Sequence, residues 1–139
     1  MKRTIIATTL LTALLLLGGC ATDRRNKSLE STLTAYGAAL RWGSFAEAES
    51  FIDPTYRKAH PLTDLDMSRY KQVRVSDYDS GNGPIPVSKG TVRQVVRIGI
   101  INKNTQRERT IIDHQTWTWD AKQKHWLLET GLPDITPEQ

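Results

Sequence analysis

The stretch TVRQVVRIGII, residues 91–101, alternates apolar and polar side chains and is rich in β-branched residues. This period of two is typical of a β-strand with one buried face. Two similar stretches follow, QRERTIIDHQTWTWD at residues 106–120 and HWLLET at residues 125–130. The polar segments NKNT and AKQK lie between the three and favour turns. The sequence therefore predicts two consecutive β-hairpins, and these decide the fold.

Upstream of the hairpins the pattern predicts one more strand and then a long loop. Val73 and Val75 alternate with polar residues, which indicates a strand over residues 73–76. Residues 79–90 contain three glycines and two prolines, which interrupt both helix and strand. About four strands are therefore expected in one antiparallel sheet.

The residues before the sheet carry helical patterns. Four apolar residues spaced by four, three and four positions form one stripe of a helix that begins near residue 28: Leu29, Leu33, Tyr36 and Leu40. The sequence SFAE, residues 44–47, matches a capping box and predicts a second helix that ends before residue 53. A third, short helix is expected over residues 63–70.

Helices followed by an antiparallel meander indicate an α+β fold with helices on one face of the sheet. The element order resembles that of the nuclear transport factor 2-like, or cystatin-like, proteins. The C-terminal stretch adds to this resemblance with WLLE (residues 126–129) followed by GLP (residues 131–133). The resemblance covers about residues 28–133. It implies N-terminal helices packed on a curved, cone-shaped antiparallel sheet of about four strands.

Pairing Ile101 with Gln106, and Trp119 with Trp126, gives an expected register for the two hairpins. In that register Gln94 lies opposite Asp113. One sheet face, expected to pack under the helices, then holds the following residues: Val92, Gln94, Val96, Ile98, Ile100, Arg109, Ile111, Asp113, Gln115, Trp117, Trp119, Trp126 and Leu128. A slip of one residue would reverse the faces.

Gln94, Asp113 and Gln115 form a polar island on this apolar face and are the candidate binding residues. The resemblance extends to ketosteroid isomerase and scytalone dehydratase, whose cone is the active site. In such a cone Asp113, desolvated by apolar neighbours, would act as a base, with Tyr36 as a second donor. The alternative is that Asp113 meets water or pairs with Arg109, and this second arrangement is the one we expect.

The remaining polar residues favour no catalytic or metal site. Asp113 and His114 are adjacent in a strand and point to opposite faces. His114 and His125 are expected about 20 Å apart, too far to share a metal ion. No nucleophile elbow, P-loop or dinucleotide-binding glycine motif occurs, and no cofactor is expected. Arg93 and Arg97 belong to the opposite, solvated face, where Val95, Ile101, Ile112 and Leu127 suggest a docking patch.

The N-terminus carries a basic start, an apolar run from Ile5 to Leu17, and then LGGC, which ends in the only cysteine. The segment resembles a bacterial lipoprotein signal peptide with its lipobox. By that resemblance residues 1–19 are removed and Cys20 is acylated, as in triacylated lipoproteins that carry palmitate. Residues 20–27 are then a polar tether, and residues 28–139 are one domain.

The apolar run is too short for a helix that crosses a bilayer, which needs about 20 residues. The residue after Cys20 is Ala21. In the lipoproteins that the segment resembles, an aspartate at this position acts as an inner-membrane retention signal, so we expect the outer membrane, facing the periplasm. Loss of residues 1–19 leaves 17 basic and 15 acidic side chains, a balance that does not favour nucleic-acid binding. With its one cysteine assigned to lipid, the chain forms no disulfide.

These observations favour a lipid-anchored envelope protein that binds a hydrophobic small molecule or a protein partner without catalysis. The alternative is an isomerase-like or dehydratase-like enzyme that uses Asp113. A structural role in an envelope complex is the third hypothesis.

Overall fold

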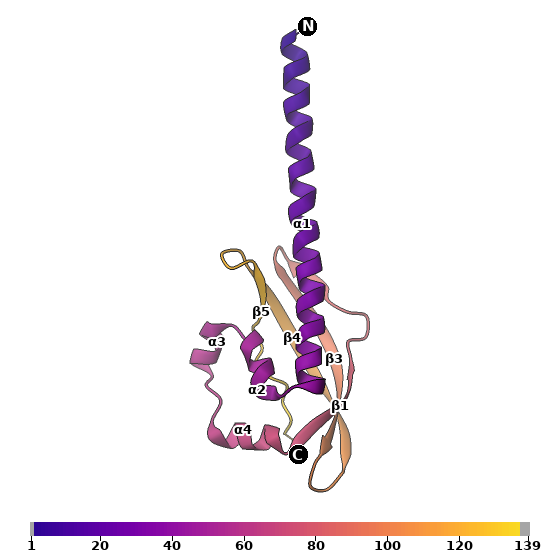
Figure 1. Ribbon diagram of the computed structural model, residues 1–139, viewed down its shortest axis with the longest axis vertical. Helices are drawn as coiled ribbons and strands as arrows, with labels where there is room; N and C mark the ends of the chain where they lie inside the picture. Colours follow the sequence, from indigo (N-terminus) through magenta and orange to yellow (C-terminus); the bar gives the residue numbers. More distant parts are fainter. Residues whose placement is uncertain (1, 137–139) are drawn as a thin grey trace.

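A long helix and a curled antiparallel sheet make up the protein (Figure 1). The computed structural model describes residues 2–136, with side chains described from residue 19 onward. The predicted signal peptide therefore lies almost wholly outside the described side chains. Within the described part, no helix combines the length and apolar character needed to cross a membrane.

Helix α1 (Lys2–Trp42) packs on the sheet over its C-terminal part and extends past the sheet toward the N-terminus (Figure 1). The predicted stripe is the face that packs: Tyr36 and Leu40 are buried, while Leu29 and Leu33 pack against the core. Residues 20–27, predicted as a tether, continue the helix. The indole Nε1 of Trp126 donates to the carbonyl of Arg25 at 3.2 Å, which attaches this segment to the sheet.

Four short helical segments follow: α2 (Phe45–Ala48), the 3-10 helix η1 (Glu49–Phe51), α3 (Pro54–Ala59) and α4 (Asp64–Lys71). Ser44 caps α2 by accepting from the Glu47 amide, as predicted, and α4 confirms the third expected helix. Helix α3 was not predicted. Its signal is the Asp53–Pro54 pair, because Asp53 caps the helix and Pro54 occupies the first turn.

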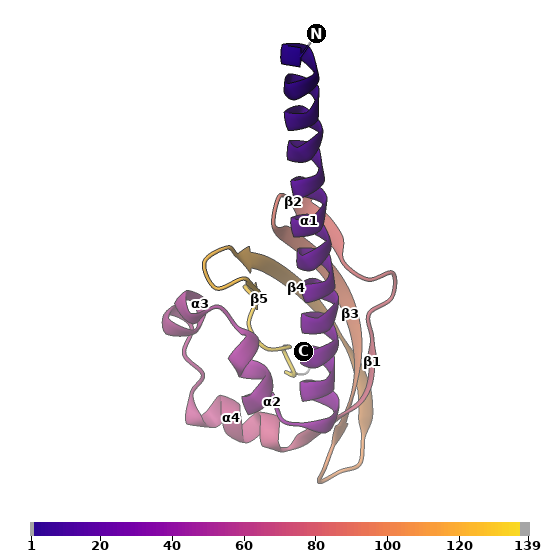
Figure 2. The ribbon, with the colours of Figure 1, turned by 45° about the horizontal axis from the view of Figure 1, so that its top comes forward.

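The sheet contains β1 (Val73–Asp79), β2 (Ile85–Ser88), β3 (Thr91–Asn102), β4 (Glu108–Asp120) and β5 (His125–Leu128). The strand order is β1-β3-β4-β5, and β2 pairs with β3 beside β1. All these pairings are antiparallel, and the sheet curls around α1 (Figure 2). The predicted α+β fold class, helices on a curved sheet, is confirmed.

Strand β2 lies inside the segment that was predicted to be a loop. It pairs only with the first residues of β3, and all four of its residues are exposed. Pro86 is tolerated there because an edge strand does not need every backbone amide for pairing. The glycines and prolines of this segment predicted a loop, and the prediction therefore missed a short edge strand.

The register predicted for β4 and β5 is confirmed, but the register predicted for β3 and β4 is wrong by two residues. Trp119 lies opposite Trp126, whereas Gln94 lies opposite Gln115 and Ile101 opposite Glu108. A shift of two residues preserves the faces, so the predicted set of inward residues stands.

The cause of the shift is the turn between β3 and β4. Asn102 accepts from the amides of Asn104 and Thr105, and Asp120 accepts in the same way from Lys122 and Gln123. Each turn ends four residues after its Asn or Asp, in a residue with positive φ. Asn102 is thus the last strand residue, as Asp120 is, although the prediction assigned it to the turn.

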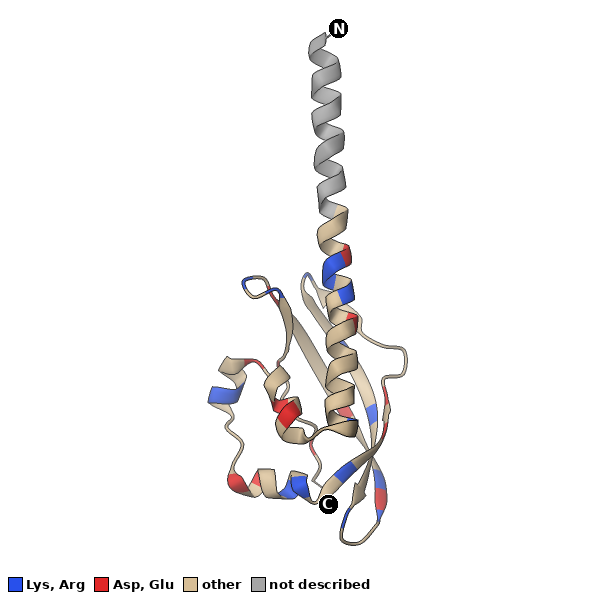
Figure 3. Cartoon of the chain, viewed as in Figure 1, with Lys and Arg blue, Asp and Glu red and all other residues tan. Residues whose placement is uncertain are grey.

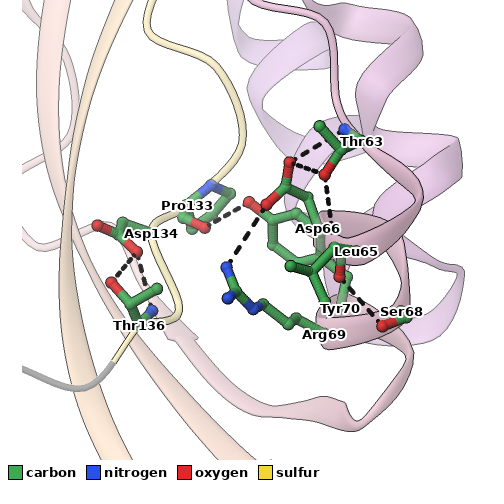
Figure 4. A network of polar contacts seen from close by, with 9 residues as sticks. All are labelled: Thr63, Leu65, Asp66, Ser68, Arg69, Tyr70, Pro133, Asp134 and Thr136. Carbon is green, nitrogen blue, oxygen red and sulfur yellow. Dashed lines mark hydrogen bonds and ion pairs between the residues drawn. The ribbon is translucent and has the colours of Figure 1, made fainter.

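The C-terminal segment closes the cone beneath the sheet. Pro133 and Ile135 are buried, and the hydroxyl of Tyr70 in α4 donates to the Pro133 carbonyl at 3.0 Å (Figure 4). Helix α4 itself is fixed by a reciprocal capping box between Thr63 and Asp66 (Figure 4). Helices and tail therefore hold the concave face of the sheet away from water.

Candidate functional site

The three predicted polar residues meet on the concave face of β3 and β4. The Gln94 Nε2 donates to Gln115 Oε1 at 2.7 Å, and Gln115 Nε2 donates to Asp113 Oδ2 at 2.7 Å. The two amides and the carboxylate therefore form a chain in which Gln115 is the centre. We call Gln94, Asp113 and Gln115 the polar island.

Aromatic side chains surround the polar island. Trp117 Nε1 donates to Gln115 Oε1 at 3.1 Å, and the Tyr78 hydroxyl accepts from Gln115 Nε2 at 3.2 Å. Tyr36 of α1 covers Trp117 in an edge-to-face contact with ring centroids 5.2 Å apart. The island is thus held between the sheet and α1, as the sequence predicted for this face.

One close approach lets α1 lie against β1. A Cβ atom added to Gly37 would come within 3.0 Å of Tyr78 Cε1, which is tighter than ordinary contact. Glycine at this position therefore allows the helix to rest on the Tyr78 ring. The same ring forms part of the wall beside the polar island.

Two buried polar atoms near the island have no hydrogen-bond partner in the described part of the protein. They are the Tyr36 hydroxyl oxygen and Gln94 Oε1. An unpaired buried donor or acceptor costs about 1–3 kcal/mol, so such atoms are rare in folded proteins. Gln94 Oε1 is thus an unused acceptor at one end of the island.

The burial of the island changes its acid–base properties. Desolvation raises the pKa of the Asp113 carboxyl, although the hydrogen bond from Gln115 and the nearby His114 oppose that rise. Burial also raises the pKa of Tyr36, and the charge on Asp113 adds to the effect. Burial raises the pKa of Tyr78 to about 12. Both tyrosines therefore stay protonated at neutral pH.

The expected pairing of Asp113 with Arg109 does not occur. Asp113 is only 9% exposed and is bonded to Gln115, while the Arg109 guanidinium donates to the carbonyls of Ile135 and Thr136. The C-terminal tail accounts for the difference, because its carbonyls reach Arg109 at the rim of the cone. The sequence offered no signal for that contact.

A groove of about 580 Å³ runs along α1, between the helix and the β1–β2 region. Its volume lies within the range of small-molecule sites. Gln94 and Tyr78 belong to its lining, whereas Asp113 does not. The lining also includes apolar and small residues of α1 together with the residue before β2: Leu29, Leu33, Gly37, Ala38 and Pro84.

The far end of the groove carries an exposed aromatic that the sequence interpretation missed. Trp42 is 78% exposed, and the Arg41 guanidinium carbon lies 4.8 Å from the centroid of its ring. Both residues line the groove. The sequence did carry a signal for this exposure, because Trp42 lies outside the apolar stripe of α1. A tryptophan outside that stripe does not pack into the core.

Two of the four apolar residues of the predicted docking patch are exposed on the convex face of the sheet, whereas Ile101 and Leu127 are half-buried. Val95 and Ile112 are 51% and 54% exposed, and Val95 lies opposite His114. Arg93 and Arg97 are exposed on the same face. Apolar side chains near exposed arginines are thus open to solvent there.

No metal centre is found among the side chains from residue 19 onward, where no group of three or more His, Cys, Asp or Glu could hold an ion. Cys20 lies exposed on α1. Its exposure is compatible with modification, and the sequence contains no second cysteine with which it could form a disulfide.

Comparisons with known proteins found no match, whether to models of protein families, to curated proteins or to solved structures.

Proposed function

We propose that this protein is a lipid-anchored binding module of the cell envelope, which holds a hydrophobic small molecule in the groove along α1 without transforming it. The observation that carries the proposal is an apolar groove of about 580 Å³ whose lining includes Gln94, a residue whose buried Oε1 has no hydrogen-bond partner. An elongated apolar ligand with one N–H or O–H donor fits that chemistry, because it would bury its body and satisfy the acceptor.

The polar island supports binding over catalysis. Gln115 uses its amide to bond Gln94, Asp113, Tyr78 and Trp117, so the island is committed to holding its own members. Asp113 points into this network and does not line the groove. Its carboxylate therefore orients Gln115, and Gln115 orients Gln94 toward its ligand.

The N-terminal signal supports the proposed location. Cys20 is exposed on α1, where an acyl group would not disturb the core. We place the acylated protein on the periplasmic face of the outer membrane, because Ala21 follows the cysteine. A protein partner at the convex patch is compatible with this anchorage.

Binding of N-phenyl-1-naphthylamine tests the groove, because this probe combines two apolar ring systems with one N–H donor. Its fluorescence should rise and shift to the blue as protein is added. Leu33→Trp fills the groove and should weaken binding at least ten-fold. Leu65→Trp, which places the same ring on exposed α4, is the matched control and should bind as the wild type does.

Two results would contradict the groove assignment. One is unchanged binding by a folded Leu33→Trp variant. The other is equal loss of binding in the Leu65→Trp control, which would indicate nonspecific adsorption of the probe. Circular dichroism of both variants verifies that they fold.

Catalysis by Asp113 is the second candidate. The observation in its favour is the buried carboxyl with its raised pKa, together with the unpaired hydroxyl of Tyr36. This alternative requires Asp113→Asn to abolish isomerisation or dehydration of the bound molecule while probe binding persists. Retained turnover in that variant would exclude Asp113 as the base.

A further inference from the structure

Three elements meet at the end of the domain from which α1 extends (Figures 1 and 2). Trp126 bonds to the Arg25 carbonyl of α1, and its ring centroid lies 5.6 Å from that of Trp119. The Trp119 amide donates to the Gly90 carbonyl in the β2–β3 turn at 2.8 Å. Residue 25 of α1, the β2–β3 turn and the β4–β5 turn are therefore neighbours.

These three elements carry a cluster of basic side chains. Blue positions mark α1 just beyond the sheet and the tips of both turns (Figure 3). We call this cluster the basic rim, and its members are Arg24, Arg25, Lys27, Lys89, Lys122 and Lys124. All are exposed except Arg25, which is half-buried.

Few acidic groups compensate the basic rim. Asp23 and Glu30 lie on the same stretch of α1, and Asp120 lies in the β4–β5 turn, where its carboxylate accepts from the amides of Lys122 and Gln123. Among the described side chains the only ion pair joins Arg69 to Asp66, away from the rim. The rim is therefore a positive surface, although the chain without residues 1–19 is close to neutral.

The basic rim lies next to the predicted site of lipid attachment. Five residues separate Cys20 from Arg25 along one helix, which is about 8 Å at 1.5 Å per residue. Electrostatic screening in physiological salt acts over a similar length, about 8 Å. The basic residues of the rim on α1 are therefore close enough to act on the headgroups of a membrane that holds Cys20, and the turns that carry the other rim lysines neighbour residue 25.

We propose that the basic rim docks onto the anionic phospholipid headgroups of the leaflet in which Cys20 is anchored. The proposal rests on the lipid anchor proposed above. The charge of the rim, its proximity to Cys20 and the attachment of α1 to Trp126 together favour a membrane surface over any other anionic partner. In the docked domain the groove begins near the membrane, at Asn26, and runs away from it to Trp42.

The size of the effect follows from surface electrostatics. A lysine or arginine near an anionic membrane contributes about five-fold to the binding equilibrium. Neutralising three lysines should therefore shift the equilibrium between docked and undocked domain by about one hundred-fold. The anchor itself would be unaffected, because it depends on the acyl chains.

The test uses the full, lipid-modified chain in vesicles of phosphatidylcholine alone or mixed with phosphatidylglycerol at 7:3, each with a headgroup-labelled quencher lipid. A fluorophore is attached through Gln123→Cys in the β4–β5 turn. The matched control is Thr105→Cys, the equivalent position of the β3–β4 turn at the other end of the sheet. We expect strong quenching at position 123 only on anionic vesicles, and weak quenching at position 105 on both.

The triple variant K89Q/K122Q/K124Q should lose this quenching, and so should the wild type in 0.5 M salt. The variant R74Q/R93Q/R97Q removes the same charge from exposed positions elsewhere on the sheet and should retain the quenching. Quenching that persists in the first variant, or that is equal on neutral vesicles, would overturn the proposal.

Flotation separates the failure of this inference from the failure of the anchor. Wild-type protein should float with pure phosphatidylcholine vesicles, whereas Cys20→Ser should not. A wild type that fails to float would overturn the lipid anchor. A wild type that floats but is never quenched at position 123 would overturn the basic rim alone.

Discussion

The two faces of the β3–β4 hairpin place neighbouring residues in opposite environments. Ile112 is 54% exposed on the convex face, while the next residue, Asp113, is 9% exposed on the concave face. The hydrophobicity of each residue would predict the reverse. The difference shows that the pleat assigns each side chain to a face, and that α1 and the C-terminal tail then decide which face is buried.

The concave face tolerates its polar residues because they bond to one another. Gln115 connects Gln94, Asp113 and Trp117 within hydrogen-bond distance. Among the described residues, the convex face carries apolar side chains without a cover, Val95 and Ile112. The concave face therefore forms the packed core of the protein, and the convex face is open to solvent.

The largest expected loss of stability comes from Trp117→Ala, on the concave face. Trp117 is fully buried, contacts Tyr36 and donates to Gln115. Truncation of a buried tryptophan costs about 3–5 kcal/mol, and here it also removes one partner of Gln115. Urea denaturation followed by circular dichroism measures the loss. A free energy of unfolding within about 1 kcal/mol of wild type would show that the concave face is not the core.

A smaller, pH-dependent effect is expected from Asp113→Asn. Because the folded pKa of Asp113 is raised, the native protein binds a proton more tightly than the unfolded chain does. Wild-type stability should therefore fall as pH rises from the unfolded pKa, near about 3.9, through the folded value. The slope is at most about 1.4 kcal/mol per pH unit for one group.

The amide that replaces the carboxyl in this variant does not ionise, so the variant should gain stability relative to wild type over that pH window. Unfolding midpoints of both proteins between pH 3 and pH 8 measure the difference. Stability of the wild type that instead rises with pH relative to the variant would mean that Asp113 is solvated or ion-paired. Such a result would remove the contrast between the two faces at this position.

The smallest effect is expected on the convex face. Val95→Ser and Ile112→Ser alter half-exposed side chains that contribute little to the core, so each should change the free energy of unfolding by under about 0.5 kcal/mol. Thermal melts of the isolated protein measure this change. A loss above about 1 kcal/mol that depends on protein concentration would instead show that the patch is covered by a second copy.

The sequence by itself determined which side chains point inward. Alternation with a period of two depends on the local pleat, so the inward set from Val92 to Leu128 was predicted correctly even with a register wrong by two residues. The stripe of α1 and the Ser44 cap of α2 were likewise local patterns. The resemblances to lipoproteins and to the cystatin-like fold stay predictions about identity.

Only the tertiary structure decided which residues meet. Gln94 pairs with Gln115 because Asn102 ends β3 and closes the turn with its side chain, a choice that the sequence NKNT leaves open. Arg109 bonds to a tail that lies 26 residues further along the chain. The groove, the exposed Trp42 and the basic rim arise where α1 crosses the sheet. Contacts between distant segments depend on how the elements pack as a whole, and no local pattern of side chains encodes that packing.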